Sequence, residues 1–203
     1  MSTGSYVALP IDESPSPSVT AFLSAFGSVA IQKANAGVVF RISPSKWGIL
    51  ADGVKASVIA EAFLSTSEKW EGGPTYTHAQ GSPRLQTMDF LASKLTPPKQ
   101  GESNLACGLE VRFKAKEGKE EDVRQFLKGA VPLVEAEPDT LLWYAIEFPD
   151  SPREFGIIDA FPSEAGRKAH LDGKVAAALF GPGKELLEGD PSVQMFDVLE
   201  AKM

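Results

Sequence analysis

In the second half of the chain, the spacing of apolar residues changes between that of a β-strand, where every second residue is apolar, and that of an α-helix, where apolar residues recur every three or four positions. Residues 109–116 alternate apolar and polar side chains, which is the pattern of a half-buried strand. Residues 119–136 then carry apolar side chains at helical spacing on one face, namely Val123, Phe126, Leu127, Ala130, Val131 and Val134. This stripe predicts an amphipathic helix that packs against the strands.

The pattern continues through four more elements. Residues 140–148 and 155–161 are rich in β-branched and aromatic side chains and flank a turn containing Asp and Pro, so they predict a hairpin. A second helix is expected from about Ser163, with an interruption at Gly173, and residues 192–200 form a last strand. The order is therefore strand, helix, strand, strand, helix, strand.

The first half of the chain repeats this pattern. Gln194 and Gln86 stand 108 positions apart (194 − 86), and this offset holds without a gap over residues 43–95. Further upstream the offset is 104, so four residues (108 − 104) are inserted in the second copy. We place the insertion in the helix-to-strand turn at residues 135–139.

The duplication predicts an α+β fold with two ferredoxin-like βαββαβ repeats, the divergent repeat 1–95 and the repeat 108–203. Residues 96–107 are rich in Pro, Gly and Ser and are interpreted as a linker. The last strand carries apolar side chains on both faces, so its sheet needs a layer on each side. The other repeat can supply one layer, which predicts that the two sheets pack into one α/β barrel, an intrachain pseudo-dimer.

Three motifs of the second repeat occur together in a known family. They are the turn "PDSP", the strand "FGIIDAF" and the helix segment Ala169–His170–Leu171. Residues 137–179 resemble the antibiotic biosynthesis monooxygenase domain of the dimeric α/β-barrel superfamily. The resemblance implies a barrel with a pocket inside, formed here by one chain that is a monomeric pseudo-dimer or a homodimer. The first repeat departs from the motif, with Ala62–Phe63 in place of His–Leu.

Composition narrows the possible partners. The net charge is −7, which argues against nucleic acid and anionic membranes as partners. The start of the chain has no signal-peptide pattern, and the single cysteine allows no internal disulfide, so a cytoplasmic location is predicted. Two histidines and one cysteine cannot form a standard metal site, and no phosphate-binding loop is present. We predict no metal and no cofactor.

Two residues are candidates for acid–base catalysis. His170 lies on the second helix, and an imidazole can accept a proton near neutral pH. The alternative is a histidine on the flank of the helix that is bonded to neighbouring groups. Asp159 stands between apolar residues in a strand, where a carboxylate needs a partner. It is either a pocket base or part of a salt bridge at the sheet edge.

Aromatic residues and a second histidine are candidates for substrate binding. Adjacent strand residues point to opposite faces, so either Trp143 or Tyr144 faces the helices and the other faces the barrel interior. Residues 70–78 concentrate aromatic side chains in a Gly/Pro loop that forms a lid or an interface, or simply packs down. The complete set of candidates is Trp143, Tyr144, Phe161, Trp70, Tyr76 and His78.

The residues and the resemblance together leave three functions open. The first is a cofactor-independent monooxygenase or related enzyme that acts on a small hydrophobic or aromatic compound, such as a phenol, quinol or anthrone. The second is a non-catalytic small-molecule-binding or stress-responsive protein, because fold does not determine function. The third is an isomerase or cyclase that uses a base in the same pocket.

Overall fold

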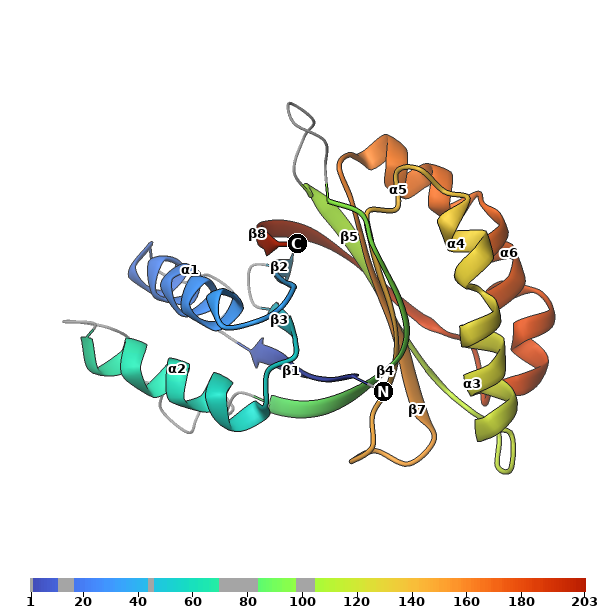
Figure 1. The fold of residues 1–203 in the computed structure, drawn as a ribbon, viewed down its shortest axis with the longest axis horizontal. Coiled ribbons are helices and arrows are strands. Elements are labelled where there is room, and N and C mark those ends of the chain that lie inside the picture. The colour runs from blue at the N-terminus through green and yellow to red at the C-terminus, as the bar shows by residue number, and fades with distance from the viewer. Residues whose placement is uncertain (1, 11–16, 44–45, 70–83, 98–104) are drawn as a thin grey trace. The chain divides into compact units, whose positions relative to one another are not determined.

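A computed structural model describes residues 2–10, 17–43, 46–69, 84–97 and 105–203 of the chain (Figure 1). The first half contains β1 (Ser2–Pro10), α1 (Pro17–Gln32), β2 (Gly37–Ser43), β3 (Lys46–Asp52), α2 (Ala56–Lys69) and β4 (Arg84–Leu95). The second half contains β5 (Cys107–Lys114), α3 (Glu120–Gly129), α4 (Val131–Glu135), β6 (Leu142–Glu147), β7 (Glu154–Phe161), α5 (Glu164–Leu171), α6 (Lys174–Phe180), the 3₁₀ helix η2 (Pro182–Leu186) and β8 (Ser192–Lys202).

Both helical regions of the second half are divided. The apolar stripe predicts one continuous helix over residues 119–136, but α3 ends at Gly129 and α4 begins at Val131. The cause is Pro132, which is tolerated in the first turn of α4 but would break a hydrogen bond inside a longer helix. The second division, between α5 and α6, falls at Gly173 as the sequence predicts.

The strands follow the order β1-β3-β2-β8-β5-β7-β6-β4, and the order closes into a barrel. Within each half, the closing strand lies beside the first strand, and the third strand lies between the first and the second. This is the strand order of a ferredoxin-like sheet. The predicted α+β fold class, with two ferredoxin-like repeats packed into a barrel, is confirmed.

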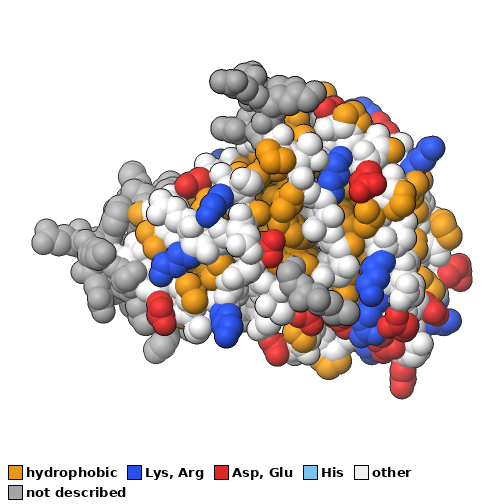
Figure 2. All heavy atoms as spheres, in the orientation of Figure 1, with side chains coloured by type: hydrophobic (Ala, Val, Ile, Leu, Met, Phe, Trp, Pro, Cys, Tyr) orange, Lys and Arg blue, Asp and Glu red, His pale blue; other side chains and the backbone are white. Residues whose placement is uncertain are grey.

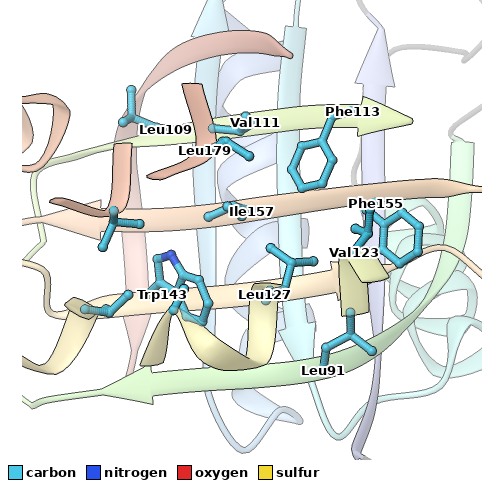
Figure 3. Packing of buried hydrophobic residues seen from close by; sticks show 14 of the residues in the cluster. Leu91, Leu109, Val111, Phe113, Val123, Leu127, Trp143, Phe155, Ile157 and Leu179 are labelled. Carbon is cyan, nitrogen blue, oxygen red and sulfur yellow. The ribbon is translucent and has the colours of Figure 1, made fainter. Parts of the chain in front are cut away.

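The described residues form two compact units, one of residues 88–196 and one of residues 2–87 with 197–203. In the first unit, α3 to α6 lie over one face of the sheet (Figure 1). Figure 3 shows the core between these helices and the neighbouring strands β5, β7, β6 and β4. In the second unit, α1 and α2 pack together over an apolar core that includes Phe26, Ile31, Val39, Ile49 and Ile59.

The closing strands β4 and β8 each begin in one unit and end in the other, because the unit boundaries fall after Thr87 and after Phe196. The last part of β4 pairs with β6, and the last part of β8 pairs with β2. Both pairings are antiparallel, and each contains one irregularity, at Leu91 in β4 and at Leu199 in β8. The repeats predicted from the sequence thus exchange the ends of their closing strands, while their proposed bounds stay a prediction.

Acidic and basic side chains are interspersed over the helical surface of the first unit on the face shown in Figure 2. Many of them form ion pairs within one helix, such as Lys119 with Asp122 and Arg124 with Glu121. In the described part of the chain, every helix is too short or too polar to cross a membrane.

Candidate functional site

Three ionisable side chains meet beneath α5 in the first unit. His170 lies in the last turn of α5 and is 6% exposed, Asp159 comes from β7 and is fully buried, and Glu137 follows α4. Helix α5 begins at this place because the Ser163 hydroxyl caps it, accepting a hydrogen bond from the Gly166 amide at 3.3 Å. The opposite end of the helix therefore holds His170 above the sheet.

The distances in this cluster define the orientation of the imidazole. His170 Nδ1 lies 2.6 Å from Glu137 Oε2, and His170 Nε2 lies 3.3 Å from Asp159 Oδ2. The Thr140 hydroxyl donates to the same Glu137 Oε2 at 2.8 Å. Because a carboxylate only accepts hydrogen bonds, Nδ1 carries a hydrogen, and Nε2 is left facing Asp159.

Burial gives Asp159 unusual acid–base behaviour. Desolvation raises the pKa of its carboxyl group from 3.8 to about 7, and the negative charge of Glu137 acts in the same direction. The charges of His170 and Arg167 and the backbone amide of Leu109 partly oppose this rise. The Asp159 carboxyl group, which lies beside His170, can therefore gain or lose a proton near neutral pH.

Two of the candidate aromatic side chains line this cluster. The Phe161 ring lies 5.3 Å from the imidazole of His170, centroid to centroid. Trp143 is the register partner of Asp159 across the β6–β7 pair, so both side chains are on the helix-covered face. Figure 3 shows its indole nitrogen directed toward β7. This buried Nε1 has no hydrogen-bond acceptor among the described residues.

The other candidates lie elsewhere. Strand alternation places Tyr144 on the opposite face of β6, where its ring is 4.6 Å from that of Phe90. Trp70, Tyr76 and His78 fall outside the described residues, so their roles stay predictions.

Glu137 and Thr140 belong to the cluster although the sequence reading did not select them. Glu137 lies in the turn at residues 135–139, where the second copy was predicted to contain four extra residues. That insertion was the one signal in the sequence that could have drawn attention to it. Among the described residues, no group of three or more His, Cys, Asp or Glu side chains is arranged to hold a metal ion.

The first repeat does not reproduce the cluster. At the offset of 108, Ala51 stands in place of Asp159 and Ala62 in place of His170. Both alanines are buried in the apolar core of the second unit. Among the described residues, the acid–base cluster is therefore found in the second repeat alone.

Comparisons with known proteins find matches among solved structures. No protein-family model matches it, and neither does any curated protein. A proposed monooxygenase from Fusobacterium nucleatum is similar over 99% of this chain and 94% of its own, at 12% identity and a TM-score of 0.73. An anthrone oxidase-like protein covers 99% of this chain and 92% of its own, at 10% identity and a TM-score of 0.65.

Two further structures complete the comparison. An uncharacterized ferredoxin-fold protein from Listeria monocytogenes, related to antibiotic biosynthesis monooxygenases, matches 98% of this chain and 96% of its own, at 9% identity and a TM-score of 0.59. A protein of unknown function from Nitrosomonas europaea matches 49% of this chain and 94% of its own, at 42% identity and a TM-score of 0.47. The full-length matches confirm the resemblance to the antibiotic biosynthesis monooxygenase family at the level of fold.

Proposed function

We propose that this protein is a cofactor-independent monooxygenase, or a closely related enzyme, acting on a small aromatic compound with an acidic hydroxyl or C–H group. The observation that carries the proposal is the buried cluster of Asp159, His170 and Glu137, in which the Asp159 carboxyl group can exchange a proton near neutral pH. Phenols, quinols and anthrones are the substrate classes that need such a base and little else from the protein.

In this proposal Asp159 and His170 act as the general base. The substrate proton passes to the Asp159 carboxylate or to His170 Nε2, which are 3.3 Å apart. Glu137, whose side chain is 18% exposed, accepts a hydrogen bond from the opposite edge of the imidazole.

The deprotonated substrate is the reductant. It transfers an electron to O₂, the two radicals combine to form a C–O bond, and loss of water from the resulting peroxide leaves a carbonyl group. A CH₂ group and O₂ thereby give C=O and H₂O, so the reaction needs no external reductant. The buried, mainly apolar surroundings of Trp143 and Phe161 suit such reactive intermediates because they exclude water.

The structural neighbours support this choice of chemistry. One is described as a proposed monooxygenase and one as anthrone oxidase-like, and both extend over 99% of this chain. Their identities of 12% and 10% limit the argument to a shared fold. The assignment of a base to this protein therefore depends on its own residues.

Oxygen uptake tests the proposal. Purified protein is incubated with a panel of phenols, quinols and anthrones, with and without O₂, beside the variant His170→Ala. We expect oxygen-dependent loss of at least one compound, slowed at least about 100-fold in the variant, the usual contribution of a general base. Unchanged turnover in His170→Ala would remove His170 from the mechanism. Equal turnover without O₂ would instead indicate an isomerase or cyclase.

The burial of the cluster also favours a second candidate, a non-catalytic binding protein. Asp159 is 0% exposed and His170 is 6% exposed, which is equally consistent with a polar group that only stabilises α5. Native mass spectrometry of protein from its own source distinguishes the two functions. An aromatic molecule that copurifies and is never converted would support binding alone.

A further inference from the structure

We propose that Lys94, at the end of β4, is a positioning residue for the cluster of Glu137, His170 and Asp159. This inference rests on the proposed function, because it assigns a role in the same site. By sequence, β4 closes the first repeat, whereas the cluster belongs to the second. Lys94, a residue of the first repeat, would thus complete a site whose other ionisable groups all belong to the second repeat.

The contacts of Lys94 are specific. Its ammonium group donates hydrogen bonds to two backbone carbonyls, those of Val134 at 3.0 Å and Glu137 at 2.6 Å. The Val134 carbonyl belongs to α4 and the Glu137 carbonyl follows it, and each also accepts a backbone N–H group, from Glu137 and from Thr140 respectively. Lys94 therefore holds the backbone of the residue whose side chain orients the imidazole.

The Glu137 side chain is held by two further features. Thr140 donates to Oε2, and Gly173 leaves room for Oε1, because a Cβ atom at Gly173 would stand 2.8 Å from that oxygen. Lys94 of β4 thus holds the backbone of Glu137. The Glu137 carboxylate lies between the Thr140 hydroxyl group and Gly173, the glycine that divides α5 from α6.

The position of this carboxylate decides which imidazole nitrogen carries the hydrogen. With Glu137 Oε2 at 2.6 Å, the hydrogen stays on Nδ1 and Nε2 faces Asp159. If the turn shifts, this hydrogen bond weakens and the imidazole is free to exchange tautomers or rotate. A residue that holds the turn therefore acts on the acid–base pair without touching the substrate.

The second repeat supplies a matched control. Lys202 stands 108 positions after Lys94 (202 − 94) at the end of β8. Its ammonium group donates to the carbonyls of Gln32 at 3.0 Å and Ala34 at 2.6 Å, at the end of α1. Lys202 makes the same type of contact as Lys94, but Ala51 and Ala62 stand at the positions that correspond to Asp159 and His170.

The test compares Lys94→Met with Lys202→Met by ¹⁵N NMR of protein labelled at histidine. The chain contains two histidines, so the His170 signals are those that disappear in His170→Gln. In the wild type and in Lys202→Met, we expect an Nδ1 signal typical of a fixed N–H group. In Lys94→Met, we expect the signal to move toward the averaged value of a freely exchanging imidazole. Lys94→Arg, which keeps the donors, should restore the wild-type signal.

Two results would overturn the positioning role. One is a wild-type Nδ1 signal in Lys94→Met, and the other is an equal change in Lys202→Met. If Lys94→Met does not fold, Lys94→Leu, which also lacks a donor, replaces it with the same expectations. The NMR signal needs no turnover, so it separates this inference from the proposed function. Where a substrate has been found, kcat/KM should fall about tenfold in Lys94→Met and stay unchanged in Lys202→Met. A wild type that converts no substrate would contradict the monooxygenase assignment but not the positioning role of Lys94.

Discussion

Replacing Asp159 with asparagine should change how the stability of the protein depends on pH. Burial in the folded protein raises the pKa of this carboxyl group to about 7 from its ordinary value of 3.8. At a pH between these two pKa values, the carboxyl group keeps its proton in the folded protein but has released it in the unfolded chain. Asp159 therefore contributes stability that is fully present below about pH 4 and is lost as the pH rises to about 7.

The size of the effect follows from the shift. A change of about three pH units, at about 1.4 kcal/mol for each unit, corresponds to about 4 kcal/mol. The amide introduced in Asp159→Asn does not titrate, so the wild type should lose about 4 kcal/mol of unfolding free energy relative to this variant between pH 4 and pH 7.5. The group is fully buried, so no reduction for solvent screening is needed.

Urea unfolding at a series of pH values, followed by circular dichroism, measures this difference. The control is Asp150→Asn, because Asp150 is exposed in the turn between β6 and β7. Its difference from the wild type should stay nearly constant over the same range. A constant difference for Asp159→Asn, or one that favours the wild type more strongly as the pH rises, would refute the reasoning about the buried carboxyl group.

Three further predictions concern the same site. Gly173→Ala should destabilise the protein by about 1–3 kcal/mol in urea unfolding, because the new Cβ would crowd Glu137 Oε1. The control is Gly129→Ala, whose Cβ would meet nothing within 4 Å; it should be neutral or stabilising by up to about 1 kcal/mol. Trp143→Phe should lose only packing energy, about 1–3 kcal/mol, because the indole N–H has no acceptor among the residues that the structure describes; a larger loss would reveal a hydrogen bond. For any substrate found, kcat/KM should rise with pH and level off above about pH 7, as the Asp159 base form appears; a decline over that range would oppose the assignment of the base.

Much of the fold could be predicted from the sequence because its signals are local. The alternating strands, the helical stripe and the 108-residue offset each depend on spacing along the chain. The exchange of strand ends could not be predicted in this way. The pairing of β4 with β6 joins residues about fifty positions apart, and spacing alone does not name the partner of a strand.

The candidate site shows the same limit. Asp159 and His170 attracted attention individually, as a carboxylate among apolar neighbours and as one of two histidines. Their proximity, and the contact of His170 with Glu137, result from the packing of α5 on the turn after α4. The repeated lysines at 94 and 202 were visible in the sequence, yet their carbonyl partners lie in a part of the chain that the repetition does not indicate.

Incorporation of oxygen from labelled O₂ tests the monooxygenase proposal most directly. A compound that the protein consumes is incubated under ¹⁸O₂ in ordinary water, and the product is analysed by mass spectrometry with rapid quenching to limit exchange. The account predicts one ¹⁸O atom in each product molecule, with the second atom released as water. A product that carries only oxygen from the solvent, or that forms equally well without O₂, would contradict it.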